Sequence, residues 1–287
     1  MAAALAPALA PALSSPQDRW FTSSDGVRLH YLEAATAQPG QPTLVFIPGW
    51  TMPAWIWSAQ IEHFAREHRV LAFDPRGQGR SSLPATGYDY GRRALDIAQL
   101  LKAAGAQDVV LVGWSLGVLE CLQYMNDSGR VAGAPTIRGL VLVDNSVGEG
   151  EPPQGGASTF LPRLRKKRRE TVQAFVKSMF KKPQPKAWLD ELTEAALRTP
   201  LPAAVALLSQ GTPREFWRET LYSLDMPVLY AYTPRLRKQG ELAAARKASI
   251  EIQVFAESGH ALFVDDAAAF NTALAGFLSR LPAPVAR

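Results

Sequence analysis

The chain has 287 residues, of which 47% are apolar and 20% are charged. A chain of this size and composition can bury a large core in one or two domains, which excludes wholesale disorder. The single cysteine, Cys121, excludes an intrachain disulfide framework and a cysteine-rich zinc site. The net charge of +5 is modest and gives only weak support for an acidic partner.

The N-terminal residues, MAAALAPALAPALSSPQDR, are rich in Ala, Pro and Leu and have no basic segment before the apolar part. We interpret residues 1–19 as a flexible arm, with part of an export signal as the alternative. Elsewhere no stretch of 18 apolar residues is free of charges and helix breakers, so no transmembrane helix is expected. The expected location is cytoplasmic, or periplasmic or secreted if the arm belongs to an export signal.

Short apolar runs then alternate with longer helical patterns, which is typical of a parallel sheet wrapped by helices. Strands are expected at residues 27–33, 44–47, 70–73, 109–112, 140–143, 228–232 and 250–255, and helices at 54–67, 94–103, 116–125 and 263–281. No strand run appears from about residue 147 to 223, where Pro, Gly and charged residues are frequent. We therefore predict an α/β core in two parts, residues 20–146 and 224–287, separated by a mostly helical insertion at residues 147–223.

The strongest motif is Gly113-Trp114-Ser115-Leu116-Gly117, which lies between an apolar strand and a helix. This is the context that a G-x-S-x-G nucleophile elbow requires. The turn strains the backbone of the serine, the glycines allow close backbone approach, and the helix N-terminus stabilises negative charge. The sequence predicts Ser115 as a catalytic nucleophile; the alternative is a tight turn with an inert serine.

A nucleophilic serine needs a base within hydrogen-bond reach. His260 follows the strand at residues 250–255 and precedes the last helix. A loop at that end of the sheet can bring the imidazole over Ser115, so His260 is the predicted base. The other three histidines are interpreted as structural or solvated: His30, His63 and His68.

The chain resembles the α/β-hydrolases over residues 44–147 and 226–281, most nearly the cofactor-free haloperoxidase and aryl-esterase branch. The resemblance rests on Pro48-Gly49-Trp50, on Trp57 with Gln60, on Phe73-Asp74-Pro75-Arg76-Gly77-Gln78-Gly79-Arg80-Ser81-Ser82, on Tyr88-Asp89-Tyr90 and on Asp96-Ile97. The Gly-Trp-Ser-Leu-Gly elbow is also similar to that of methyl esterases that act on pimeloyl groups held by acyl carrier protein. These motifs are specific for the superfamily and not for a substrate.

The resemblance implies an α/β-hydrolase fold: a mostly parallel twisted sheet with helices on both faces, and a helical cap at residues 147–223. It also implies an oxyanion hole made by the backbone N–H groups of Trp50 and Leu116. Losing one such donor typically costs about 2.7–4 kcal/mol of transition-state stabilisation. Pro48 replaces the usual histidine before the glycine, which leaves the Trp50 N–H available but changes the hydrogen bonding of the loop.

The triad acid is where the sequence departs from this family. The resemblance implies an Asp after the seventh strand, near Leu236, but no carboxylate occurs there before Glu241. Asp144 ends the strand at residues 140–143, next to the strand of the nucleophile, and some lipases and haloalkane dehalogenases resemble this arrangement. We predict that Asp144 orients His260. The alternatives are Glu149, Glu151, Glu241 or a Ser–His pair without an acid.

Four tryptophans come from segments around the predicted site. Trp50 and Trp114 are predicted to bind substrate, because large rigid rings there would form an apolar pocket for an acyl or aryl group. Trp55 and Trp57 are interpreted as further pocket residues or as packing of a helix on the sheet.

Residues 161–182 carry nine basic residues and one acid, Glu170, so this segment is +8 and the rest of the chain sums to −3. The basic residues are Arg163, Arg165, Lys166, Lys167, Arg168, Arg169, Lys177, Lys181 and Lys182. Apolar residues recur among them at helical spacing, which indicates a lid helix. The basic segment is interpreted as a solvated lid surface, as a docking surface for an acidic carrier protein, or as a site for an anionic membrane or substrate. Nucleic acid is not expected, because no recognition motif accompanies it.

The sequence therefore predicts a serine hydrolase that cleaves a small-molecule carboxylic ester through an acyl-enzyme, without metal or organic cofactor. The resemblance adds perhydrolase side activity, because peroxide can replace water at the acyl-enzyme. Two alternatives stay open. One is a methyl esterase or thioesterase acting on carrier-protein-bound acyl groups, and the other is a hydrolase-fold binding protein with little turnover.

Overall fold

The computed structural model describes residues 15–127, 133–151 and 157–283 of the chain. An eight-stranded sheet with the order β1-β2-β4-β3-β5-β6-β7-β8 forms the centre of this part. The strands are β1 (Gln17–Thr22), β2 (Arg28–Ala34), β3 (Thr43–Ile47), β4 (Val70–Asp74), β5 (Asp108–Trp114), β6 (Thr136–Val143), β7 (Val228–Tyr232) and β8 (Ile250–Val254). The β1–β2 and β2–β4 pairs are antiparallel, and all other pairs are parallel. The expected mostly parallel sheet is therefore present.

The first strand was not expected from the sequence. It begins at Gln17, within the segment interpreted as an arm, and pairs with β2 from Gln17–Glu33 to Thr22–Arg28. Its residues are mostly exposed, so their pattern carries no core signal, and pairing with β2 is what orders them. Residues 17–19 therefore belong to the sheet and not to the expected arm, and residues 1–14 lie outside the described residues.

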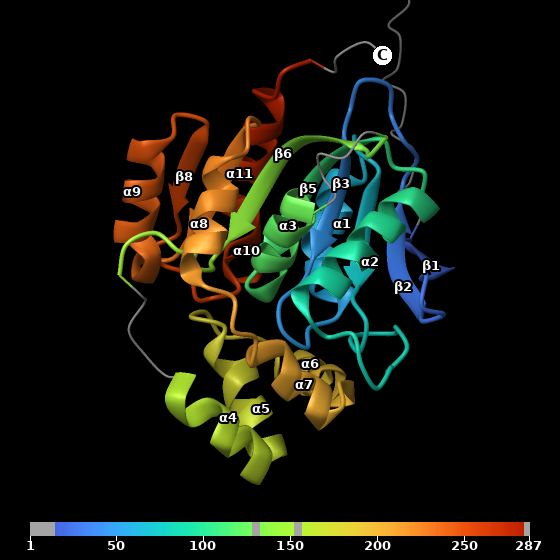
Figure 1. Ribbon diagram of the computed structural model, residues 1–287, viewed down its shortest axis with the longest axis vertical. Helices are drawn as coiled ribbons and strands as arrows, with labels where there is room; N and C mark the ends of the chain where they lie inside the picture. The colour runs from blue at the N-terminus through green and yellow to red at the C-terminus, as the bar shows by residue number, and fades with distance from the viewer. Residues whose placement is uncertain (1–14, 128–132, 152–156, 284–287) are drawn as a thin grey trace, which may run out of the picture.

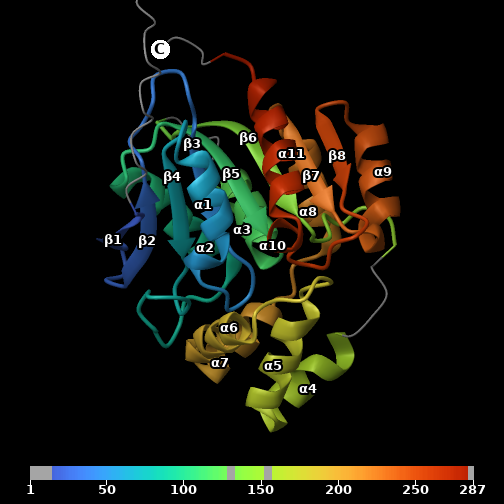
Figure 2. The same cartoon turned by 180° about the vertical axis from the view of Figure 1, so that it is seen from behind.

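Helices cover both faces of the sheet. The helical elements are η1 (Ala54–Trp57), α1 (Ser58–Phe64), α2 (Tyr90–Ala103), α3 (Leu116–Asp127), α4 (Ala157–Lys166), α5 (Arg168–Ser178), α6 (Lys186–Arg198), α7 (Leu201–Leu208), α8 (Arg214–Tyr222), η2 (Pro234–Leu236), α9 (Arg237–Arg246), α10 (Leu262–Asp265) and α11 (Ala267–Ser279). Helices α2, α3 and α8 lie on one face, and α1 and α11 lie on the other (Figures 1 and 2). None of the helices in the described ranges has the length and apolarity needed to cross a membrane.

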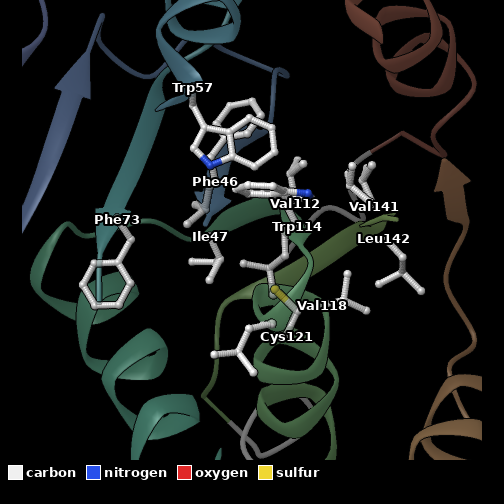
Figure 3. Packing of buried hydrophobic residues seen from close by; sticks show 14 of the residues in the cluster. Phe46, Ile47, Trp57, Phe73, Val112, Trp114, Val118, Cys121, Val141 and Leu142 are labelled. Carbon is white, nitrogen blue, oxygen red and sulfur yellow. The ribbon is translucent and has the colours of Figure 1, made fainter. Parts of the chain in front are cut away.

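The core lies on both sides of the central strands. All residues of β3, β4 and β7 are buried, as expected for parallel strands covered by helices on both faces. Figure 3 shows Trp57 lying over Phe46 on one side and Cys121 beside Val118 in α3 on the other. The Trp57 ring also stacks on Phe263, with centroids 3.8 Å apart. This packing fixes β3 and β5, the two strands that lead into the predicted site.

Helices α4 to α7, which we call the helical layer, form a separate group beyond the carboxyl ends of the strands (Figures 1 and 2). Helix α8 also falls within the expected insertion at residues 147–223, but it packs on α3 beside the sheet. Trp217 and Leu221 of α8 are buried, and the Trp217 ring lies 4.9 Å from that of Tyr90 in α2. Helix α8 therefore belongs to the core, because its apolar side chains are buried against α2 and α3.

Two helix boundaries differ from the sequence expectation for local reasons. Helix α2 begins at Tyr90, four residues earlier than expected, because the Asp89 side chain accepts the N–H of Arg92 and caps the helix. The expected helix at residues 263–281 is divided into α10 and α11 at Asp266, whose backbone leaves the helical region with φ −137° and ψ 60°. The carboxylate of Asp265, at this break, accepts hydrogen bonds from two segments that are distant in sequence, and these bonds are described below.

Candidate active site

Ser115 lies at a sharp turn between β5 and α3. Its φ of 54° places a residue other than glycine in the left-handed region, which is a strained conformation. The turn requires its glycines, because a Cβ on Gly113 or Gly117 would lie 2.5 Å from a backbone oxygen. Further bonds hold the serine in place: its N–H donates to the Val143 carbonyl at 2.9 Å, and its own carbonyl accepts Asn145 Nδ2 at 2.7 Å. This geometry is that of the expected elbow.

His260 and Asp144 form a hydrogen-bonded pair. His260 Nδ1 lies 2.8 Å from Asp144 Oδ2, and the exposed side-chain fractions are 24% and 1%. The other carboxylate oxygen accepts both the N–H and the hydroxyl of Thr233, each at 2.8 Å. Burial alone would raise the pKa of Asp144, but the hydrogen bonds from His260 and Thr233 outweigh it and hold the pKa below its ordinary value. The carboxylate is therefore ionised and oriented toward the imidazole.

Strand order explains why Asp144 reaches this position. Strands β6 and β7 are parallel neighbours, and Val143 pairs with Ala231. Asp144 and Thr233 therefore follow the carboxyl ends of adjacent strands, at one edge of the sheet. The Asp144 backbone has a φ of 46°, and its N–H donates to the Ala231 carbonyl at 2.9 Å. Thr233 was not identified from the sequence; its place directly after β7 is the signal that could have found it.

The other acid candidates have different partners. Glu149 accepts the hydroxyl of Tyr222 at 2.5 Å, Glu241 lies 3.8 Å from Arg237 at the surface, and Glu151 is exposed. The position near which the family would place an acid, Leu236, is buried in η2. Its neighbour Arg235 lies 3.8 Å from Asp144 Oδ2, so a cation stands near the acid here. Within the described ranges, Asp144 is the carboxylate that contacts His260.

Trp114 connects the elbow to the histidine loop. Its indole N–H donates to the His260 carbonyl at 2.9 Å, and the two rings lie 5.2 Å apart. Trp114 is 1% exposed and its ring also contacts Phe263, so it supports the site from the core side. Trp114, which was expected to bind substrate, thus contacts the predicted base His260 and is buried.

The loop after β3 lies directly beside Ser115. A Cβ on Gly49 would be 2.9 Å from the Cβ of Ser115, so glycine is needed for this approach. The approach brings the backbone of Trp50 next to the start of α3, where Leu116 is the first helical residue and its N–H lacks an intrahelical partner. The two N–H groups expected to form an oxyanion hole are therefore on adjoining segments.

A buried polar network holds that loop. Gln78 Nε2 donates to the carbonyls of Gly49 at 3.0 Å and Met52 at 2.9 Å. Gln78 Oε1 accepts from Arg93 at 2.9 Å, and Arg93 in turn donates to Glu120 of α3 at 2.5 Å. Burial raises the pKa of Glu120, and the guanidinium of Arg93 opposes that effect. The sequence identified Gln78 only as part of a family motif; Arg93 and Glu120 were not identified.

The Trp50 side chain points to the helical layer. Its indole N–H donates to the Ala204 carbonyl of α7 at 2.7 Å, and its ring makes edge contacts with Phe160 and Phe175 at 5.4 and 5.1 Å. These three rings form an apolar group between sheet and helical layer. Trp55 contacts Trp188 of α6, with centroids 5.8 Å apart, whereas Trp57 packs in the core as described above.

Some of the basic residues at positions 161–182 have local partners. Arg168 donates to two backbone carbonyls, and four others form ion pairs: Lys167 with Glu170, Arg169 with Glu194, Lys181 with Glu257, and Lys182 with Asp266. Four remain exposed without an ion pair in the described part of the chain: Arg163, Arg165, Lys166 and Lys177. These four, which we call the unpaired cations, lie on α4 and α5.

The remaining histidines take structural positions or lie at the surface. His30 is buried between Asp74 at 2.7 Å and Asp18 at 2.9 Å, and His63 is exposed. The interpretation of His68 as solvated is wrong, because it is buried with Nδ1 3.1 Å from the Pro42 carbonyl. Residues 15–127, 133–151 and 157–283 contain no group of three or more His, Cys, Asp or Glu that could hold a metal ion.

Known proteins resemble this chain over different spans. A non-heme haloperoxidase of Rhodococcus erythropolis is 34% identical over 139 residues, 46% of this chain; that match spans only 49% of the relative's length. A pimeloyl-[acyl-carrier protein] methyl ester esterase of Vibrio atlanticus is 26% identical over 83% of this chain and 95% of its own. The solved structure of an esterase from Rhodococcus sp. ECU1013 is similar with a TM-score of 0.76 and 26% identity, covering 92% of this chain and 99% of its own.

The family model described as "Alpha/beta hydrolase family" matches residues 44–273, which include the elbow, Asp144 and His260. The expected fold and the expected family are thereby confirmed. On the evidence of the elbow, the sheet and this match, the chain belongs to the alpha/beta hydrolase family.

Proposed function

We propose that this hydrolase cleaves carboxylic esters by a serine mechanism, with Ser115 as nucleophile, His260 as base and Asp144 as the acid that orients the base. The observation that carries the proposal is the 2.8 Å contact between His260 Nδ1 and a buried Asp144 carboxylate. A carboxylate on Nδ1 leaves Nε2 free to accept the serine proton. The strained Ser115 at the end of β5 supplies the matching nucleophile.

In this mechanism Ser115 Oγ attacks the acyl carbon of the ester while His260 Nε2 accepts its proton. The negative charge that develops on the carbonyl oxygen is stabilised by the N–H groups of Trp50 and Leu116. His260 then protonates the departing alkoxide, which leaves an ester between Ser115 and the acyl group. A water molecule opens that ester with the same base, and Ser115 is regenerated.

We propose that the helical layer acts as a cap and that the acyl or aryl group lies against the apolar rings of Trp50, Phe160 and Phe175. Aromatic side chains bury large apolar areas and favour ring contacts. Peroxide can take the place of water at the acyl-enzyme, so we also propose perhydrolysis as a side activity; the haloperoxidase among the relatives supports this.

The decisive test compares the wild type with Ser115→Ala on p-nitrophenyl esters of increasing chain length, together with labelling by a fluorophosphonate. The wild type should hydrolyse esters and be labelled, while the variant should keep its fold and do neither. A wild type that folds but is neither labelled nor active would instead support a hydrolase-fold binding protein. Activity of Ser115→Ala above a few per cent would exclude Ser115 as the nucleophile.

A second candidate function is hydrolysis of acyl esters carried by an acidic carrier protein. The unpaired cations Arg163, Arg165, Lys166 and Lys177 favour it, because they are exposed and form no ion pair with an acid of the described residues. Reversing Arg165 and Lys166 to Glu should raise KM for a carrier-bound ester and leave small esters unchanged. Reversing the already paired Arg169 provides the matched control. Equal effects on both substrates would reject docking.

A further inference from the structure

Asp265, the last residue of α10, is a buried carboxylate that the mechanism above does not use. It is 7% exposed, and no Lys or Arg side chain of the described residues forms an ion pair with it. Backbone N–H groups balance it instead: Oδ2 accepts from Gly259 and from Lys181, each at 2.7 Å. Oδ1 accepts from the Lys182 N–H at 3.3 Å and from Gln184 Nε2 at 3.2 Å. A charge that is taken out of water must gain such bonds to be tolerated.

These bonds join two segments that are distant in sequence. One is the loop that carries His260, and the other is the linker between α5 and α6, residues 179–185, which belongs to the helical layer. A further bond between them runs from the Ala261 N–H to the Met179 carbonyl at 2.9 Å. The segments are in close contact, since a Cβ on Gly259 would lie 2.6 Å from Met179 O and 2.8 Å from Lys181 N.

His260 is therefore held through both of its neighbours and through its own carbonyl. Gly259 donates to Asp265, Ala261 donates to the linker, and the His260 carbonyl accepts the Trp114 indole at 2.9 Å. The 24% exposure of the His260 side chain shows that packing around the ring is incomplete. The backbone hydrogen bonds of Gly259, His260 and Ala261 therefore help to fix the position of the imidazole.

We propose that Asp265 is a positioning residue for the catalytic base: it binds the α5–α6 linker to the His260 loop, so that seating of the helical layer fixes the imidazole between Asp144 and Ser115. This inference rests on the proposed serine mechanism. It assigns the carboxylate a role in the rate of the chemical steps rather than in substrate affinity, because Asp265 acts through His260 and does not touch the substrate.

The test compares Asp265→Asn with Asp266→Asn as the matched control. Asp266 is the next residue, but its side chain is 37% exposed and its contact is an ion pair with Lys182 at 3.6 Å. Asparagine at position 265 keeps the shape of the aspartate side chain and removes its negative charge. Its NH2 group cannot accept the hydrogen bonds that one of the carboxylate oxygens accepts. With p-nitrophenyl acetate, kcat should fall roughly 10- to 100-fold and KM should change by less than about twofold, since a 1 Å misplacement of a catalytic group can cost about 100-fold. Asp266→Asn should stay within about twofold on both parameters.

Gly259→Ala tests the same contact without touching the carboxylate. Its methyl group would meet backbone atoms of the linker and separate the two segments, so it should reproduce the fall in kcat with KM retained. If Asp265→Asn fails to fold, the kcat and KM of Gly259→Ala decide whether the contact positions His260. The proposal is overturned if the folded variants keep kcat within about twofold of the wild type, or if KM rises as much as kcat falls.

A readout that needs no turnover separates this proposal from the proposed function. The Nδ1 proton shared by His260 and Asp144 should give a downfield proton NMR signal in the wild type and in Asp266→Asn. That signal should broaden or disappear in Asp265→Asn and Gly259→Ala. A wild type that hydrolyses no ester would refute the serine mechanism, and the NMR signal alone would then decide whether Asp265 positions His260. An unchanged signal in both variants would refute positioning.

Discussion

Thr233 holds Asp144 from two directions, with its N–H and its hydroxyl each 2.8 Å from the same oxygen, Oδ1. That arrangement leaves Oδ2 to His260. The two oxygens of one carboxylate are thus divided between Thr233, at the end of β7, and the imidazole of His260. The family resemblance led us to expect an acid after β7, whereas here the end of β7 supplies Thr233 as a donor to Asp144, which follows β6.

The hydroxyl of Thr233 should contribute measurably to the rate. Thr233→Val removes that donor and keeps the backbone N–H and the branched shape. One hydrogen bond to a charged group is worth about 1.5–3 kcal/mol, so kcat for a p-nitrophenyl ester should fall roughly 10- to 160-fold. Thr233→Ser keeps the donor and should stay within about threefold of the wild type. Equal kcat for the Val and Ser variants would show that the hydroxyl has no part in holding Asp144.

Asp144→Asn should lower kcat by roughly 10²–10⁴-fold, because the amide favours the wrong imidazole tautomer; the equivalent change in a serine protease costs about 10⁴-fold. Glu241→Gln is the control and should stay within about threefold, since that residue pairs with Arg237 at the surface. Combining Asp144→Asn with His260→Ala should be little worse than His260→Ala alone, because the acid acts through the base. Near-normal kcat in folded Asp144→Asn would reject Asp144 as the acid.

Asp144 should also make the stability of the fold depend on pH. Burial raises the pKa of Asp144, the hydrogen bonds from His260 and Thr233 oppose this and lower the pKa by more, and the net shift is downward. A lowered pKa contributes stability that is complete above the unfolded value, about 3.9, and is lost as the pH falls through the folded value. The difference in free energy of unfolding between wild type and Asp144→Asn should therefore shrink below about pH 4. Urea denaturation at pH 5.5 and pH 3.5 measures it; a larger difference at the lower pH would contradict the sign.

Phe175 should contribute to acyl selectivity. Phe175→Ala opens the edge contact with Trp50 and should raise KM for long-chain or aryl esters several-fold, while acetate esters change by less than about twofold. Phe216 is also partly buried but lies on α8, where it contacts Trp217, so Phe216→Ala is the control. The same shift in KM for acetate and for long esters would place the substrate elsewhere.

Local sequence was sufficient for the parts of the protein that depend on neighbouring residues. The elbow around Ser115 follows from a buried strand, two glycines and a helix start within a few positions, and its strained φ of 54° is as expected. Seven of the eight strands were identified, and among them β3, β4 and β7 are buried along their whole length and read as continuous apolar runs. The family was recognisable for the same reason, since its motifs are contiguous.

Tertiary structure decided which of several possible contacts form between distant segments. The sequence predicted that Asp144 pairs with His260 but left other acids open, because the two residues are 116 positions apart and their contact depends on the parallel order of β6, β7 and β8. Strand β1 is exposed and is ordered by pairing with β2. Helix α8 lies in the core and not with the helical layer, because its apolar face packs against α3. Asp265 is one of two adjacent aspartates in the sequence, and the role proposed for it rests on hydrogen bonds that form where the α5–α6 linker meets the His260 loop. Such segments can form hydrogen bonds and bury side chains against each other only after the order of the strands has brought their ends to the same edge of the sheet.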